Sequence, residues 1–381
     1  MKGTFRRIFL SIVSASATLS ASAQGYSACI QESIPPARPL FGRDTVTMFI
    51  TGDVMMHSRQ MEYPMRTFLE NLQGRMKGAD ISVVNMEFTL AGKPYSGYPS
   101  FSAPDCYADY VSRCGADVFL TANNHIMDKG GRGLSRTMDI YRKMEAAGKI
   151  RFTGVSADSA DNAGRYPLTV HAKGIRIALV NFTYGTNVKW DGGWPKVNIA
   201  DKKDIASALA RAKKTGADFI VALPHWGTEY ELRHSPSQEA MAEWLVESGV
   251  DAVVGAHPHV VQDSCVMDGV PVFYSLGNAV SNMSAKNTRI ELGVKLIFTR
   301  DWNGDMKMLK PEITYLWCSL PGKLTDSYAT IAVEDYIGRR DIWLDPSDYD
   351  NMIATYINVK NVTKLRDNID ISGESLHKER R

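Results

Sequence analysis

The sequence predicts an α/β protein built on a layered sheet, and two patterns carry this prediction. From Thr45 onward, short apolar runs of strand length alternate with longer amphipathic segments of helical spacing. The phrase Gly-Ala-Asp followed by apolar residues occurs at 78–81, 115–118 and 216–219, and the similar GVDAVV lies at 249–254. Each phrase joins the end of a helix to a buried strand. This is the pattern of a layered sheet and not a solenoid repeat.

The expected strands are apolar runs bounded by polar residues or glycine, and the expected helices have apolar positions three and four apart. The strands are 45–52, 79–85, 116–122, 174–182, 217–223, 250–256, 270–277 and 290–299. The helices are 62–76, 107–115, 133–148, 201–216 and 235–249. The last helix has the clearest boundaries, because it starts with Ser-Pro and ends at Gly249.

Four segments are expected along the chain. Residues 1–23 have a basic start, an apolar stretch and a final Ala-Ser-Ala, which is typical of a signal peptide. Residues 24–44 contain three prolines and predict a linker, and residues 45–318 form the main domain. Residues 319–381 are more polar, so we expect a C-terminal extension that packs on the domain through peripheral strands and a short helix and ends in a frayed tail.

The N-terminal pattern predicts export to the periplasm or cell envelope. The apolar stretch at 8–19 is shorter than the roughly 20 residues that span a bilayer, which argues against a membrane anchor. The alternative is a lipid-anchored form, with Cys29 in Tyr-Ser-Ala-Cys as the acylated residue.

Charge and cysteine spacing exclude two classes of function. With 44 basic and 42 acidic residues, bulk electrostatics gives no reason to expect a nucleic-acid partner. None of the five cysteines has C-x-x-C spacing, which argues against a thiolate metal site or a redox motif. Pairing of Cys106 with Cys114 stays open for an oxidising compartment.

Polar phrases follow six of the predicted strands, at the point where each strand ends. In open α/β folds, sites gather where strands finish and loops begin. The polar residues are Asp53 after the first strand, Asn85 and Glu87 after the second, Asn123, Asn124, His125 and Asp128 after the third, His225 and Glu229 after 217–223, His257 and His259 after 250–256, and Asn278 after 270–277.

Carboxylate, amide and imidazole groups are ligands of divalent metals such as Zn, Mn and Fe. Two histidines one residue apart on extended backbone would project to the same side, and Pro258 between His257 and His259 would stiffen that segment. Taken singly, these residues have plainer interpretations. Asp53 could cap a turn. Asn123 and Asn124 could form turns, and His125 could be a satisfied buried histidine.

The ordered phrases GDVMMH, NMEFTL, TANNHIMDKG, PHWGTEY, GAHPHVVQ and YSLGNAV resemble the motif set of the CapA proteins. These are capsule or poly-gamma-glutamate biosynthesis proteins, related in fold to calcineurin-like metallophosphoesterases. The resemblance runs from about residue 46 to 300. It implies a four-layer α/β/β/α sandwich of metallophosphoesterase type, with one or two divalent ions (Mn, Zn or Fe) at the strand ends.

The resemblance also implies roles for the individual residues. His125 would help to protonate the leaving group. Asp53 and His259 would serve the first metal, Glu87 would stand at the position that bridges two metals, and His225 and His257 would serve the second metal. Asn124 would be the ligating asparagine. Two departures weaken the first metal position: Met55 stands where a histidine is expected, and Glu87 stands where the bridging residue is an aspartate.

Other polar and aromatic residues are expected around the ligands rather than among them. Asp128 and Glu229 would orient imidazoles. Asn85, Asn123 and Asn278 are expected in the second shell or the substrate pocket, with a helix-cap role as the alternative for Asn278. His57 lies four positions after Asp53 and could reach the same site, but we expect it in a first-turn surface position. We expect His171, His234 and His377 in structural or solvated positions, and Trp226, Tyr230 and Trp244 in the core and pocket wall.

Two functions follow as hypotheses. The first is an exported metal-dependent hydrolase acting on a phosphoester or related bond, with an envelope polymer or a phosphorylated molecule as substrate and an amide bond of the polymer as a second possible target. The second is a non-catalytic scaffold or polymer-binding subunit of a membrane-associated capsule synthase.

Overall fold

The structure is a computed structural model that describes residues 44–189, 191, 193–367 and 369. The expected signal peptide, the linker up to residue 43, Cys29 and His377 lie outside the described residues. No helix within the described part is long and apolar enough to cross a membrane.

The larger sheet has seven strands and is half parallel, half antiparallel. Strands β1 to β4 run parallel, whereas β13, β14 and β15 are antiparallel to their neighbours. The parallel half brings the carboxyl ends of its strands to one edge. The order is β15 (Ala329–Ala332), β14 (Met306–Ser319), β13 (Ile290–Arg300), β1 (Asp44–Val54), β2 (Ile81–Met86), β3 (Val118–Leu120) and β4 (Arg151–Thr153).

The second sheet has six strands, and its centre is also parallel. Strands β7, β9, β10 and β12 are parallel neighbours, and the edge strands β11 and β6 are antiparallel. The order is β11 (Ser264–Met267), β12 (Val270–Phe273), β10 (Ala252–Val254), β9 (Phe219–His225), β7 (Ile175–Thr183) and β6 (Leu168–Ala172), and a separate pair is formed by β5 (Val155–Ser156) and β8 (Lys196–Val197).

Alternation along the strands separates the core into layers. Met48 packs between the two sheets, whereas its neighbour Phe49 packs on the outer face of the larger sheet. Leu179 and Val180 divide in the same way between the inter-sheet core and the outer face of the second sheet. The predicted four-layer α/β/β/α architecture is therefore confirmed.

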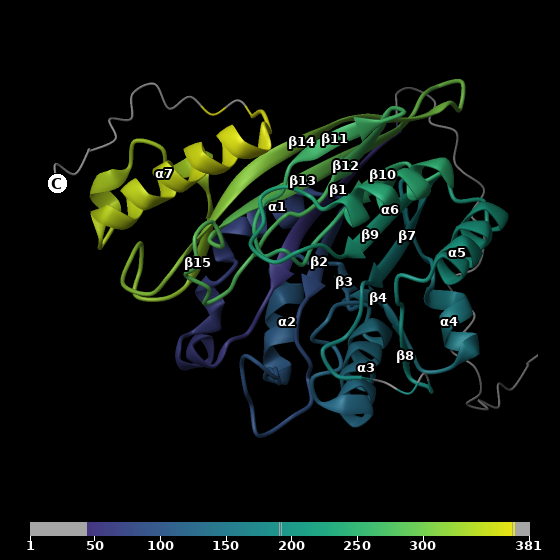
Figure 1. Cartoon of the computed structure of the whole chain (residues 1–381), viewed down its shortest axis with the longest axis horizontal. Coiled ribbons are helices and arrows are strands. Elements are labelled where there is room, and N and C mark those ends of the chain that lie inside the picture. The colour runs from purple at the N-terminus through teal and green to yellow at the C-terminus, as the bar shows by residue number, and fades with distance from the viewer. Residues whose placement is uncertain (1–43, 190, 192, 368, 370–381) are drawn as a thin grey trace, which may run out of the picture. The chain divides into compact units, whose positions relative to one another are not determined.

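The outer layers are helices (Figure 1). The larger sheet is covered by α1 (Gln73–Gly78), α2 (Asp105–Arg113) and α3 (Gly130–Ala146), and the second sheet by α5 (Lys202–Lys214) and α6 (Pro236–Glu247), with α4 (Ser159–Arg165) preceding β6. The α6 boundaries match the sequence signals, since the Ser235 hydroxyl accepts from the Gln238 N–H and Pro236 takes the first helical position.

Two helix predictions were wrong. The expected helix at 62–76 is instead three 3₁₀ turns at Ser58–Glu62, Met65–Thr67 and Glu70–Leu72, followed by the short α1. Pro64 lacks an N–H group and its ring disfavours a helical residue before it, so the chain breaks there.

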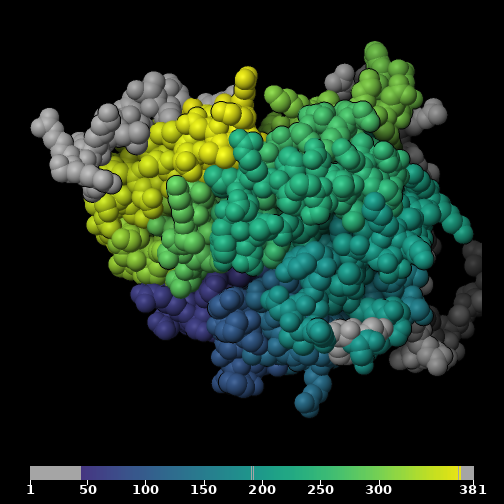
Figure 2. Space-filling view, in the orientation of Figure 1, coloured from purple at the N-terminus to yellow at the C-terminus, as the bar shows by residue number. Residues whose placement is uncertain are grey.

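The C-terminal helix is longer than the expected short one. α7 (Pro346–Thr363) follows the 3₁₀ turns Val333–Tyr336 and Arg340–Ile342 and packs Tyr349, Met352 and Tyr356 into the inter-sheet core. Figure 2 shows this yellow segment lying directly against the green part of the chain. Residues beyond 318 thus add β15 to the edge of the larger sheet and α7 to the core.

Candidate metal centre

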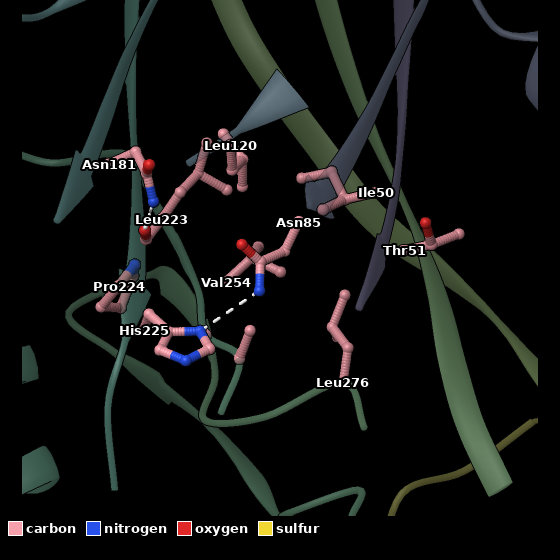
Figure 3. A pocket seen from close by; sticks show the side chains of 12 residues that line it. Ile50, Thr51, Asn85, Leu120, Asn181, Leu223, Pro224, His225, Val254 and Leu276 are labelled. Carbon is pink, nitrogen blue, oxygen red and sulfur yellow. Dashed lines mark hydrogen bonds between the residues drawn. The ribbon is translucent and has the colours of Figure 1, made fainter. Parts of the chain in front are cut away.

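The site lies where strands of both sheets end. Asp53 is the second-last residue of β1, Glu87 directly follows β2, and His225 is the last residue of β9. His257 and His259 lie in the segment after β10, and all five side chains are buried. Figure 3 shows Asn85 from the larger sheet pointing at His225 from the second one, with 3.3 Å between Nδ2 and Nδ1.

A bulge in β1 brings Asp53 into this position. The pairing of β1 with β2 shifts register between Thr51 and Asp53, which leaves Gly52 unpaired with that strand. A Cβ at Gly52 would overlap the carbonyl oxygen of Gly277, so only glycine fits. The Asp53 N–H then donates to that same carbonyl at 2.9 Å.

Asp53 is a buried carboxylate with several donors around it. Oδ1 accepts from the Asn85 amide at 2.7 Å, and Oδ2 accepts from the His257 N–H at 3.3 Å and lies 3.4 Å from His259 Nδ1. Burial alone would raise the pKa of Asp53, but the His259 hydrogen bond and the charges of His225 and His259 lower it to about 2. Asp53 is therefore ionised at neutral pH, as a metal ligand must be.

Glu87 gives the clearest test of whether a metal fits. It is fully buried, and neither carboxylate oxygen has a hydrogen-bond partner within the described residues. His225 Nε2 and His259 Nε2 lie 3.7 and 3.8 Å from its Oε1. Burial first, and the Asp53 charge second, raise the pKa of Glu87 well above its ordinary value. A buried carboxylate in this state lacks a cation, so the donor set fits a divalent ion.

Two groups of side chains offer ligand atoms that all lie within 4.8 Å of one another. They are Asp53, Glu87 and His225, and Glu87, His257 and His259. Glu87 belongs to both groups, which is the arrangement of a residue between two metal positions. His257 and His259 fall into one group, and His225 falls into the other.

The expected extended backbone at His257 and His259 was wrong. Their φ angles are 103° and 58°, so both residues lie in the left-handed region that non-glycine residues rarely adopt. The His257 Nδ1 atom is buried and has no partner within the described residues. Strained backbone of this kind persists where the surrounding structure requires it, and here it aims both rings at Glu87.

The Asn124–His125 pair lies beside His225. Asn124 Oδ1 is 2.7 Å from His225 Nε2, and His125 Nδ1 is 2.7 Å from Asp128 Oδ2. Burial and the neighbouring His257 lower the pKa of His225 well below its ordinary value, so this imidazole is neutral, which is the form that binds metal ions. The Asp128 contact is the imidazole-orienting role predicted from the sequence.

Three asparagines hold the other polar groups in place. Asn123 donates to Asn85 Oδ1 at 3.2 Å and to the Met86 carbonyl at 2.9 Å. Asn278 Oδ1 is 2.9 Å from His259 Nδ1, and its amide donates to the Thr288 carbonyl at 3.0 Å. Asn85, Asn123 and Asn278 are all buried, and their contacts orient the site without leaving a free ligand atom.

Glu229 and His57 are placed differently from expectation. Glu229 is exposed and forms no hydrogen bond to an imidazole in the described part of the chain. Its charge contributes to raising the pKa of His259 without contact between the two side chains. His57 is only partly exposed, packs edge-on against Phe101, and accepts from the Asn282 N–H at 3.3 Å. Burial lowers its pKa to about 4. Phe101 also contacts His125, so His57 is a neighbour of the site and not a surface residue.

Met55 does not reach the site. Its side chain is 1% exposed and packs in the core between the larger sheet and its helices. Met55, where the resemblance to metallophosphoesterases predicts a histidine, is therefore a core residue in this protein.

Sequence reasoning missed two asparagines. Asn187 accepts from the Asn124 amide at 3.5 Å and lies 3.3 Å from His125 Nδ1. Asn181 is buried and joins the sheets, because Oδ1 accepts from the N–H groups of Thr121 and Ala122 while its amide donates to Leu223. The available signal was the polar residue Asn181 inside an apolar strand, where a buried amide must find partners.

One prediction follows from Glu87. A carboxyl group whose folded pKa is raised stabilises the protein below its unfolded pKa and loses that contribution as pH rises. In metal-free protein at pH 8, Glu87→Gln is therefore expected to raise Tm by a few degrees, at about 2–4 °C for each 1 kcal/mol. Calorimetry below pH 4.5 should show a smaller difference, and a lower Tm at pH 8 would contradict the prediction.

Fold and site together define a two-sheet α/β sandwich with a histidine- and carboxylate-rich centre at its strand ends. The family model described as bacterial capsule synthesis protein PGA_cap matches residues 47–283. The chain therefore belongs to this family of bacterial capsule synthesis proteins.

Similar proteins carry related names. The chain is 28% identical to the capsule biosynthesis protein CapA of Bacillus anthracis, over 65% of this chain and 62% of that protein. It is 33% identical to the PGA biosynthesis protein CapA of Bacillus subtilis, over 51% of this chain and 50% of that protein. The chain thus spans about half to three fifths of the length of these relatives.

Among solved structures, the chain is similar to the calcineurin-like phosphoesterase YfkN of Bacillus subtilis, with a TM-score of 0.46 and 13% identity over 85% of this chain and all of that chain. A second is the NAD nucleotidase of Haemophilus influenzae, with a TM-score of 0.45 and 13% identity over 73% of this chain and 59% of that chain.

Proposed function

We propose that this protein is a metal-dependent hydrolase that cleaves a phosphoester or related bond during the biosynthesis or export of a capsule or poly-gamma-glutamate. The observation that carries the proposal is Glu87, a fully buried carboxylate with no hydrogen-bond partner in the described residues and with imidazoles on two sides. The names of the relatives support the biological setting.

The ligands would come from both sheets. Asp53, Glu87, Asn124, His225, His257 and His259 would hold one or two divalent ions, with Mn, Zn and Fe as the metals suited to this donor set. A bound ion of this kind lowers the pKa of a water molecule and polarises a substrate oxygen.

His125 would supply the proton to the leaving group. Its Nδ1 donates to Asp128 at 2.7 Å, which fixes the tautomer and leaves Nε2 as the atom that gains and loses the proton. The edge of Phe101, with ring centroids 4.6 Å apart, holds the imidazole plane in place.

The proposed location is the periplasm or cell envelope, reached through the N-terminal signal, with a lipid anchor at Cys29 as the alternative. The substrate would be an envelope polymer or a phosphorylated molecule, and subunits of a membrane-bound capsule synthase are the proposed partners.

The test is metal analysis of the purified protein together with hydrolysis of a model phosphodiester. We expect close to one or two equivalents of bound metal and activity that disappears with a chelator and returns with added metal. Protein that binds no metal and cleaves no ester would overturn the proposal.

His125→Ala should lower kcat by roughly 10²–10⁴ while the bound metal stays at the wild-type level, because a general acid contributes that much and this residue is not a ligand. His171→Ala is the matched control, because His171 pairs with Arg176 at the start of β7, at the opposite end of the sheet from the site. Full activity in His125→Ala would leave a hydrolase with a different acid.

A second candidate function is a polymer-binding scaffold of the synthase. Met55 favours it, because burial of this residue in the core leaves the first metal position one ligand short. Bound polymer without turnover in metal-loaded protein would support this alternative.

A further inference from the structure

Three loops beside the site carry exposed aromatic side chains. Tyr98, Tyr184 and Tyr230 are 74%, 49% and 46% exposed. These three residues are called the aromatic rim below. Aromatic side chains beside a small number of polar groups are typical of ligand-binding sites.

Two members of the rim are attached directly to the ligand-bearing segments. The Tyr184 ring lies 4.7 Å from the His257 ring, and its N–H donates to the His225 carbonyl at 2.9 Å. The Tyr230 ring lies 6.3 Å from the His259 ring, and its N–H donates to the Pro258 carbonyl at 2.8 Å. Backbone hydrogen bonds thus tie both loops to the ligand-bearing segments, and Tyr230 has a φ of 68°.

Glu229 provides an exposed carboxylate next to Tyr230. Burial raises the pKa of Tyr184, and the nearby carboxylates of Glu229 and Glu87 add to this effect. Burial and Glu229, followed by Tyr98, raise the pKa of Tyr230 to about 12. Glu229 directly precedes Tyr230 in the chain, is itself exposed, and forms no ion pair among the described residues.

We propose that the aromatic rim and Glu229 bind an ammonium group of the substrate and so position the adjoining bond over the metal centre. Aromatic faces attract cations through the ring quadrupole, and a neighbouring carboxylate adds charge complementarity. This assignment rests on the proposed function, and it gives Glu229 a role at the substrate in place of the imidazole-orienting role expected from the sequence.

The ammonium group has two chemical sources in such a setting. One is a phosphodiester with an aminoalkyl or trimethylammonium substituent. The other is the free amino terminus of a polyamide chain, which is its single cationic group.

The experiment compares substrates that share a leaving group. In metal-loaded protein, p-nitrophenylphosphorylcholine should have a KM about tenfold below that of methyl p-nitrophenyl phosphate. This preference should fall about tenfold in each of three variants, Glu229→Gln, Tyr184→Ala and Tyr230→Ala. The cause should be a higher KM for p-nitrophenylphosphorylcholine, with the amount of bound metal unchanged. Tyr184→Phe and Tyr230→Phe should retain it, because the ring face remains. Trp302→Ala is the control, since Trp302 is 88% exposed on the β13–β14 hairpin, at the end of the larger sheet opposite Asp53.

Calorimetry provides an arm that does not depend on turnover. Phosphocholine, and γ-glutamyl peptides with a free or an acetylated amino terminus, are titrated into wild-type protein and Glu229→Gln. Weaker binding of phosphocholine or of the free peptide to Glu229→Gln supports the proposal. Whichever of these two ligands binds more tightly to the wild-type protein identifies the source of the ammonium group.

The outcomes separate the two proposals. Ammonium binding without hydrolysis of any ester overturns the hydrolase and keeps the rim assignment. Hydrolysis with equal KM values for the two esters, or an equal effect of Glu229→Gln on both, overturns the rim assignment and keeps the hydrolase. Absence of both binding and hydrolysis overturns both.

Discussion

Asp53→Asn is expected to abolish metal binding and to lower the rate of the proposed ester hydrolysis roughly a thousandfold, since the several kcal/mol of transition-state stabilisation that a bound ion supplies would be lost. Both carboxylate oxygens of Asp53 accept hydrogen bonds, from Asn85 and from the His257 N–H. An amide can accept on only one side, so the second side would place N–H against N–H. Metal analysis by mass spectrometry and ester hydrolysis measure the two effects.

Asp44→Asn is the matched control, because Asp44 begins the same strand and pairs with Arg300 at the opposite end. The stability of the metal-free protein should also change with pH in the direction that the lowered Asp53 pKa requires. A carboxylate with a folded pKa of about 2 contributes stability above its unfolded pKa of 3.8 and loses it as pH falls toward 2. Wild-type metal content in Asp53→Asn would remove Asp53 from the ligand set.

The second large effect is structural. Arg289→Met is expected to lower the free energy of unfolding by about 3–5 kcal/mol, because it leaves the Asp348 carboxylate buried without its cation. Arg289 donates to both oxygens of Asp348 at 2.6 Å and to the Cys318 carbonyl at 2.9 Å, and it stacks on Trp317. The pair joins the start of β13 to α7. Urea unfolding followed by circular dichroism measures the loss.

Arg340→Met tests the same geometry at the surface. Arg340 also makes two hydrogen bonds to an aspartate of α7, Asp350, but in solvent. Its replacement should leave the urea midpoint unchanged. The double variant Arg289→Met/Asp348→Leu should recover much of the loss, since an apolar pair leaves no buried charge. Equal effects of the two arginine variants would contradict this account.

Most of the sandwich could be predicted from the sequence because its strands are buried on both faces and are therefore continuous apolar runs. All eight expected strand regions contain a strand, and four of the five expected helices form within a few residues of their predicted ends. The edge strands β4, β6 and β11 and the β5–β8 pair were missed, since short strands of this kind lack that apolar run. The helix at 62–76 failed because the spacing of its apolar residues outweighed Pro64 in the prediction.

The site residues could be found for a different reason: a parallel sheet collects the polar residues at the ends of its strands on one edge. The distances between them could not be predicted. The left-handed backbone at His257 and His259 depends on contacts with Asp53 and Asn278, which lie far away in the sequence. The cysteines illustrate the same limit, since Cys106 is exposed, Cys114 is buried, and both thiols are free.

The wide separation of the metal-ligand residues along the chain also has a consequence for folding. The ligand atoms come from residues 53 to 259 and from both sheets, so the centre depends on contacts of high sequence separation. Closing such long loops is slow, and no early folding intermediate with only one sheet formed would hold all the ligands. We therefore expect metal to be captured late, after the two sheets have docked. Metal would then slow global unfolding of the whole sandwich, so kinetic resistance to protease would report whether the protein is loaded.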